Sequence, residues 1–98
     1  MTGEAELLEQ VEAASRDAFE LARAKADGGG DDLSDRARRL DQVLDDLVPA
    51  IQGVDGDAAA VMQEKWTDAR ADVLWVLSDG TMPTSLRLGS YLREQRRD

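Results

Sequence analysis

The side chains of this 98-residue chain that could do chemistry are chiefly carboxylates, because the sequence contains no cysteine and no histidine. These absences remove thiol nucleophiles, disulfides, the usual zinc sites and the commonest general base at neutral pH. Carboxylate pairs such as Asp45–Asp46 and Glu9–Glu12 fall on polar faces. Neither forms an enclosed pair whose pKa values would be driven apart for acid and base catalysis. We therefore predict that the protein is not an enzyme.

The stretch "GGGDDLSD", residues 28–35, raises the possibility of a cation or phosphate site. Asp31, Asp32 and Asp35 offer oxygen ligands, but an EF-hand loop needs alternating ligands and a bidentate glutamate at its twelfth position. A phosphate-binding loop would need a preceding strand and a following Gly-Lys-Ser or Gly-Lys-Thr. The expected role is a solvated, flexible linker, with no metal and no cofactor.

Charge is spread unevenly over the chain, whose net charge is −9. Residues 1–80 carry eight basic and nineteen acidic side chains, whereas residues 81–98 carry four arginines and two acids. Nucleic-acid binding gains its free energy largely from Lys and Arg contacts to phosphates. The acidic body is therefore expected to repel nucleic acid, and the expected partner is a protein.

Membrane insertion and classical export are not indicated. No apolar run approaches the roughly 18 residues of a membrane span. The acidic stretch "MTGEAELLEQ" lacks the basic and apolar regions of a cleaved signal peptide. The location stays open between the cytoplasm and export without a cleaved signal peptide.

Apolar residues at spacings of three and four predict three long helices, at about residues 4–26, 33–50 and 57–79. Their stripes are Leu7, Val11, Ala14, Ala18 and Leu21; then Leu33, Ala37, Leu40, Leu44, Leu47 and Ile51; then Ala59, Met62, Trp66, Ala69, Val73 and Val76. Pro49 has no amide hydrogen, so the second helix is expected to kink or end near Val48. Asp57 is the expected N-cap of the third helix, which should end before Gly80.

Two adjacent stripes joined by about five residues are typical of an antiparallel helical hairpin. The predicted fold is therefore all-α: a helical hairpin or a small three- to four-helix bundle, with Trp66 in the hairpin core. Residues 1–81 form the predicted bundle domain. Residues 82–98 are expected to form a short basic helix or a tail, with Gly89 weakening the helical alternative.

The stretch "IQGVDGDAAAVMQEKW", residues 51–66, resembles the WxG helical-hairpin family of small type VII secretion substrates. That family has a Trp-x-Gly turn, an alanine-rich start to the next helix and a later aromatic. Ile51 and Gly53 occupy the positions of the turn, and Trp66 that of the aromatic. Ile51 replaces the family's tryptophan, and Tyr91 is followed four residues later by Gln95 rather than by the acid of the family's export signal. The resemblance implies a homo- or heterodimeric secretion substrate or helper.

Trp75 is expected to lie opposite Trp66 on the third helix, because nine residues at about 100° each make about two and a half turns. Either the first helix covers this second tryptophan, or a partner chain does. Tryptophan is enriched among the residues that dominate binding interfaces. We predict that Trp75, Leu88, Tyr91 and Leu92 contact a partner.

The C-terminal segment offers an alternative function. "LGSYLREQRRD" is similar to the first helix of Cro-type helix-turn-helix regulators, but no recognition helix follows it, so DNA binding is not implied. "SLRLGSYL" resembles the peptides that dock cargo inside encapsulin shells. The alternative is an intracellular adaptor or regulatory accessory that docks through this segment. A structural interpretation stands beside it, in which Leu88 and Leu92 pack on the bundle.

Overall fold

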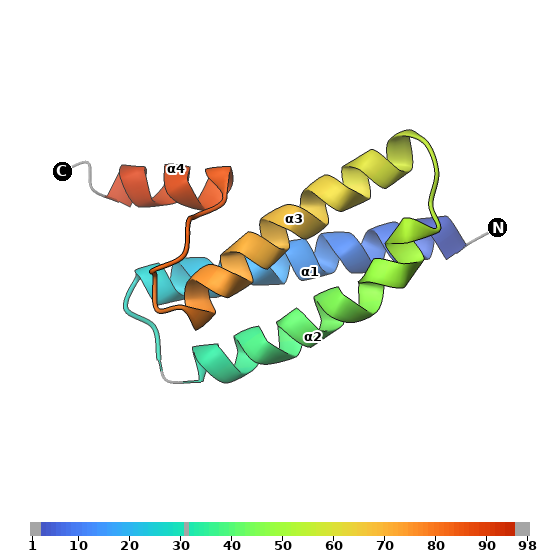
Figure 1. The fold of residues 1–98 in the computed structure, drawn as a ribbon. Coiled ribbons are helices and arrows are strands. Elements are labelled where there is room, and N and C mark those ends of the chain that lie inside the picture. Colours follow the sequence, from blue (N-terminus) through green and yellow to red (C-terminus); the bar gives the residue numbers. More distant parts are fainter. Residues whose placement is uncertain (1–2, 31, 96–98) are drawn as a thin grey trace.

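A computed structural model describes residues 3–30 and 32–95, which form four α-helices and no strand. The helices are α1 (Gly3–Ala26), α2 (Leu33–Gln52), α3 (Asp57–Leu77) and α4 (Leu86–Gln95). Figure 1 shows α1, α2 and α3 running alongside one another, with the short α4 beyond them at the end opposite the N-terminus. The predicted all-α fold is confirmed, and the molecule is a small helical bundle rather than a bare hairpin.

The predicted apolar stripes meet in one core between α1, α2 and α3. Small residues on α1, among them Ala14, Ala18 and Ala22, are buried and let this helix approach its neighbours closely. Helix α1 packs more extensively on α3 than α2 does. The buried apolar residues are Leu7, Val11, Ala14, Ala18, Leu21, Ala22, Leu33, Ala37, Leu44, Leu47, Ile51, Met62, Ala69, Val73, Val76 and Leu88.

Helix α2 continues past Pro49 to Gln52, so the predicted termination near Val48 is excluded. Proline has a helical φ but cannot donate a hydrogen bond to the carbonyl of Asp45, four residues before it. The neighbouring carbonyl of Leu44 accepts a hydrogen bond from the Trp66 indole, at 2.8 Å. This hydrogen bond joins α2 to α3 one residue before the carbonyl that Pro49 leaves without an intrahelical donor.

Replacing Pro49 by alanine is expected to raise the free energy of unfolding by about 1 kcal/mol. Alanine restores the amide donor and favours the helix more than proline does, while losing proline's restriction of the unfolded chain offsets part of the gain. Pro49 is exposed, so the change removes little packing. Urea unfolding followed by far-UV circular dichroism measures the effect. An unchanged or lower midpoint would contradict it.

The ends of α3 differ from the sequence expectations. Gly56, not Asp57, is the N-cap, and no side-chain hydrogen bond caps the helix. At the other end α3 stops at Leu77, and Asp79 rather than glycine takes the left-handed position, with φ 59°. The amide of Gly80 donates to the carbonyl of Trp75 at 2.9 Å. A non-glycine residue in this conformation costs about 1 kcal/mol.

Helix α4 resolves the alternative between a helix and a tail. It contains Gly89, which allows a close approach: a Cβ there would lie 3.1 Å from the side-chain oxygen of Thr84. Helix α4 packs against α1 and α3 through a fully buried Leu88. The C-terminal segment is therefore folded onto the bundle at least as far as Gln95.

Candidate functional site

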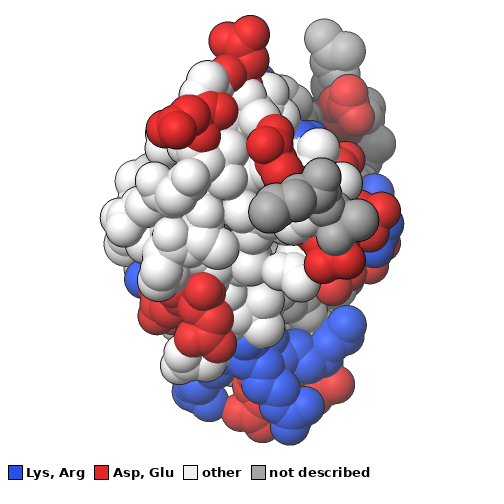
Figure 2. Space-filling model, turned by 90° about the vertical axis from the view of Figure 1, so that its right-hand side faces the viewer, with Lys and Arg blue, Asp and Glu red and all other residues white. Residues whose placement is uncertain are grey.

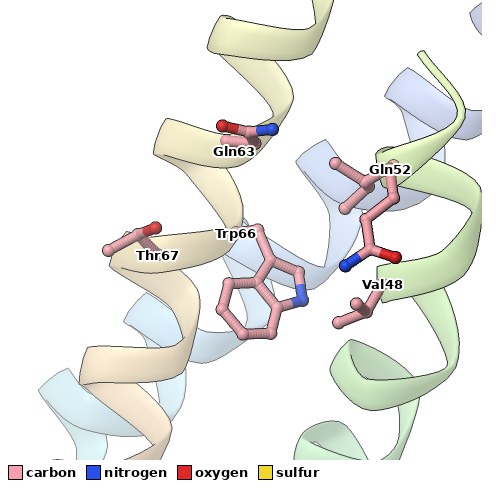
Figure 3. A pocket seen from close by; sticks show the side chains of 6 residues that line it. Val48, Gln52, Gln63, Trp66 and Thr67 are labelled. Atoms are coloured by element: carbon pink, nitrogen blue, oxygen red, sulfur yellow. The ribbon is translucent and has the colours of Figure 1, made fainter.

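A groove of about 270 Å³ lies between α2 and α3. None of its lining residues is charged, in a chain where 34% of residues are. They are Val48, Ile51, Gln52, Gln63, Trp66 and Thr67. Figure 3 shows the indole of Trp66 lying between the two helices, with Val48 and Gln52 on one side and Gln63 and Thr67 on the other. We call this feature the Trp66 groove.

The indole of Trp66 is held from two sides. Its N–H donates to the Leu44 carbonyl, which leaves the half-buried ring with no unpaired polar atom. The guanidinium of Arg70 lies 5.6 Å from the ring centroid, within the range of a cation–π contact. Arg70 also forms an ion pair with Asp45, at 2.7 Å. Its Nε lies 3.1 Å from the buried Oδ1 of Asp41, but this contact is not aligned as a hydrogen bond. The ring is thus fixed before any partner arrives.

Charged residues lie around rather than in the Trp66 groove. Figure 2 looks onto the end of the bundle that carries the α2–α3 turn. It shows a broad uncharged area on one side, with scattered acidic side chains and a cluster of basic ones at the lower edge, where α2 lies. This area is the largest uncharged surface in that view.

A second feature joins α4 to the bundle through a buried carboxylate. Asp72 of α3 is fully buried and accepts hydrogen bonds from the hydroxyl of Ser85 at 2.6 Å and from Nε of Arg87 at 2.9 Å. The other two guanidinium nitrogens of Arg87 donate to the hydroxyl and the carbonyl oxygen of Ser15, each at 2.9 Å. We call Ser15, Asp72, Ser85 and Arg87 the Arg87 cluster. It connects α1, α3 and α4.

Burial dominates the electrostatics of the Arg87 cluster. Desolvation raises the pKa of Asp72 above its ordinary value, and the lowering effects of the Ser85 hydrogen bond and of Arg87 do not fully compensate. Ser85 and Arg87 both donate to Asp72, and Arg87 also donates to Ser15, so the polar groups of the cluster satisfy one another within the chain. Its geometry is that of a structural anchor rather than of a nucleophile with its base.

Aromatic contacts continue this anchor along α1. Phe19 lies between the guanidinium groups of Arg87, at 4.9 Å, and Arg23, at 5.4 Å, while the Tyr91 ring meets it edge-on at 6.3 Å. The Tyr91 hydroxyl donates to both carboxylate oxygens of Asp27, at 2.9 and 3.0 Å. This hydrogen bond raises the pKa of Tyr91.

The residues predicted to contact a partner lie mostly against their own chain. Trp75 is half-buried and borders a hollow with Lys25 of α1, Gly80 and Leu92. Tyr91 and Leu92 are also half-buried, and Leu88 is fully buried. A partner could reach Leu88 only after α4 moves away. Of the residues predicted for the hairpin turn and core, Ile51 and Trp66 meet in the Trp66 groove, and Gly53 follows the last residue of α2.

The Arg87 cluster was not predicted from the sequence. One signal for it exists: Asp72 interrupts the apolar stripe of α3 beside Val73, three residues after Ala69 and four before Val76. A carboxylate at such a position requires a cationic or hydrogen-bonding partner. The sequence alone does not say which arginine supplies it.

The described residues contain no group of three or more acidic side chains placed to hold a metal ion. Asp31, one of the three residues considered for a cation site, lies outside them. Within the same ranges, no helix is both long and apolar enough to cross a membrane. Comparison of the chain with protein-family models, curated proteins and solved structures finds no match.

Proposed function

We propose that this protein is a non-enzymatic interaction protein that binds a helix of a partner along the Trp66 groove, as a homodimer or a heterodimer. The observation that carries the proposal is the uncharged lining of this groove around a fixed tryptophan. Helix-in-groove recognition needs an apolar floor between two helices and few charges to desolvate. The Trp66 groove has no charged lining residue, and Val48, Ile51 and Trp66 supply its apolar part.

The energetics favour Trp66 as the anchor of such an interface. Its indole N–H is already bonded to Leu44, so covering the ring strands no donor. Full burial of a large apolar side chain contributes about 1.5–3 kcal/mol, of which covering the half-buried Trp66 ring supplies a part, and preorganisation lowers the entropic cost of binding. Gln52 and Gln63 at the groove add uncharged donors and acceptors for the partner's polar groups.

The resemblance to WxG hairpin proteins supports the same proposal. Trp66, one of the residues that carry the resemblance, lines the groove, and Ile51, which stands at the position of the family's turn tryptophan, lines it too. We propose a role as a secretion substrate or helper of that type. The alternative, an adaptor that docks through residues 82–98, is less favoured because Leu88 and Arg87 are engaged within the chain.

Thr67→Arg is expected to weaken partner binding at least about tenfold, because one unpaired charge in an apolar contact costs more than about 1.4 kcal/mol. Thr67 is exposed and lines the groove, so folding should be unchanged. Ala5→Arg is the matched control, since it adds the same charge at an exposed position of α1.

Two measurements suit this prediction. Sedimentation velocity over a range of concentrations tests self-association, and quantitative affinity capture from cells that express the protein tests a different partner. Both should respond to Thr67→Arg and not to Ala5→Arg. Equal binding by the two variants would contradict the proposed use of the groove.

A further inference from the structure

We infer that the site on α1 and α3 that holds α4 also accepts α4 from a second copy of the chain, so that two copies can exchange these helices. The exchanged dimer would use the Arg87 cluster and the linker before α4. It does not rest on the proposed function, because the Trp66 groove lies on the α2 side of α3.

The α4 site is a complete recognition site for a short segment. Helix α4 contributes the buried Leu88 and the five N–H donors of Arg87. The residue before α4, Ser85, contributes its hydroxyl. The bundle supplies the buried carboxylate of Asp72 and two oxygens of Ser15. Asp72 needs a cation, but nothing in this geometry requires that cation to come from the same copy.

The linker to α4 contains a strained hinge. Residues 79–84 are all exposed, although the linker borders the half-buried Trp75, and Asp79 pairs with Lys25. The chain turns back at Asp79 and Gly80, with φ values of 59° and 84°. Extending the linker would release Asp79 from its left-handed conformation. Short hinges that hold such strain favour exchange of the element they connect.

Two exposed apolar side chains flank this hinge, which points to a second copy as the occupant. Leu86 is 89% exposed and Met82 44%, and no described large hydrophobic side chain is more exposed than Leu86. In an exchanged dimer the two linkers run side by side about a twofold axis, so each of these residues would face its own counterpart. The hinge would then bury side chains that the monomer leaves in water.

The charges of the α4 segment suit the α4 site of either copy. Residues 81–98 hold four arginines against two acids, whereas residues 1–80 are strongly acidic. This attraction is the same within one copy and between two copies, whereas the two bundles repel each other, so exchange should increase as salt screens that repulsion.

Reciprocal charge variants test the exchange. Asp72→Arg and Arg87→Asp each place like charges in the α4 site and should remain monomeric alone, with α4 undocked. When the two variants are mixed, the Asp72→Arg copy supplies Arg87 to the native Asp72 of the Arg87→Asp copy. The other site then pairs the introduced arginine at position 72 with the introduced aspartate at position 87. We expect at least about ten times more heterodimer in the mixture than homodimer in either sample, measured by native mass spectrometry. Mixtures that stay monomeric would overturn the inference.

A shortened hinge gives a second test that leaves the Arg87 cluster intact. Deleting residues 80–82 reduces the reach of the linker by about 10 Å, which disfavours the return of α4 to its own site relative to docking on a second copy. The expected product is a dimer with the helical content of the parent, and a folded monomer would overturn the inference. Adding Thr67→Arg should leave this dimer intact, which separates it from any dimer that forms through the Trp66 groove.

Discussion

Replacing Arg87 by alanine is expected to lower the free energy of unfolding by about 3 kcal/mol at neutral pH. The change leaves the Asp72 carboxylate in a fully buried position with Ser85 as its remaining partner. Breaking a buried ion pair from one side costs about 3–5 kcal/mol. Undocking of α4 would let water reach Asp72, which limits the loss to the lower end of this range.

Urea unfolding measures this loss, and two further variants identify its cause. Arg93→Ala changes an exposed arginine of the same helix that bonds only to Ser90 among the described contacts, and should stay within about 0.5 kcal/mol of the parent. Asp72→Asn combined with Arg87→Ala should recover more than half of the loss, because no buried charge then remains. If the double variant is no more stable than Arg87→Ala, the loss of stability comes from lost packing on Phe19 instead.

The loss caused by Arg87→Ala should also shrink as the pH falls from 7 towards 5. Burial already raises the pKa of Asp72 in the folded chain, and removing Arg87 takes away an effect that lowers it. A carboxyl whose folded pKa exceeds its unfolded value binds protons first in the folded state, so acid stabilises the fold relative to neutral pH. Lys25 lowers the pKa of Asp79, so the stability that this ion pair contributes is lost only below pH 4, outside the range from pH 7 to 5. If the loss of unfolding free energy caused by Arg87→Ala is the same at pH 7 and pH 5, the buried charge of Asp72 is not its cause.

Leu88→Ala is expected to destabilise the protein by about 3 kcal/mol. Leu88 is fully buried, and truncating a buried leucine to alanine costs about 2–5 kcal/mol in lost transfer free energy and cavity formation. Leu86→Ala is a matched control two residues away, because Leu86 is 89% exposed. That variant should change the free energy of unfolding by less than about 0.5 kcal/mol.

Hydrogen exchange locates the effect of Leu88→Ala. The amides of α4 should lose most of their protection, while those in the middle of α1 and α3 keep theirs, because α4 can open without unfolding the bundle. Combining Leu88→Ala with Arg87→Ala should cost less than the sum of the two, since each releases the same helix. Strict additivity would show that α4 remains docked in both single variants.

The sequence predicted the three long helices well because their signals are local. Stripes such as Leu44, Leu47 and Ile51 recur at helical spacing, and glycines mark both turns. The errors fall at helix ends: α2, which the Trp66–Leu44 hydrogen bond joins to α3, continues past Pro49, and Asp79, which pairs with Lys25, takes a position usually held by glycine. These contacts join residues far apart in the chain, which periodicity does not reveal.

The candidate site could be predicted only in part, for the same reason. The hairpin pattern assigned Ile51 to the second stripe and the turn and Trp66 to the core, but it did not predict that both would line one groove. The Arg87 cluster depends on contacts between residues far apart in the chain: Arg87 bonds to Asp72 and to Ser15, and Ser15 lies 72 positions before it. Trp75 was left open between α1 and a partner, and it proves to be half-buried beside the end of α1 and the linker.

The positions of the two tryptophans make the chain its own optical probe. Trp66 lines the groove between α2 and α3, whereas Trp75 borders the hollow closed by Leu92 and the linker to α4. The sequence contains no third tryptophan, so Trp75→Phe leaves an emitter at the groove and Trp66→Phe leaves one at the α4 site. Emission wavelength and quenching in these two variants can therefore follow partner binding and α4 release separately, without any added label.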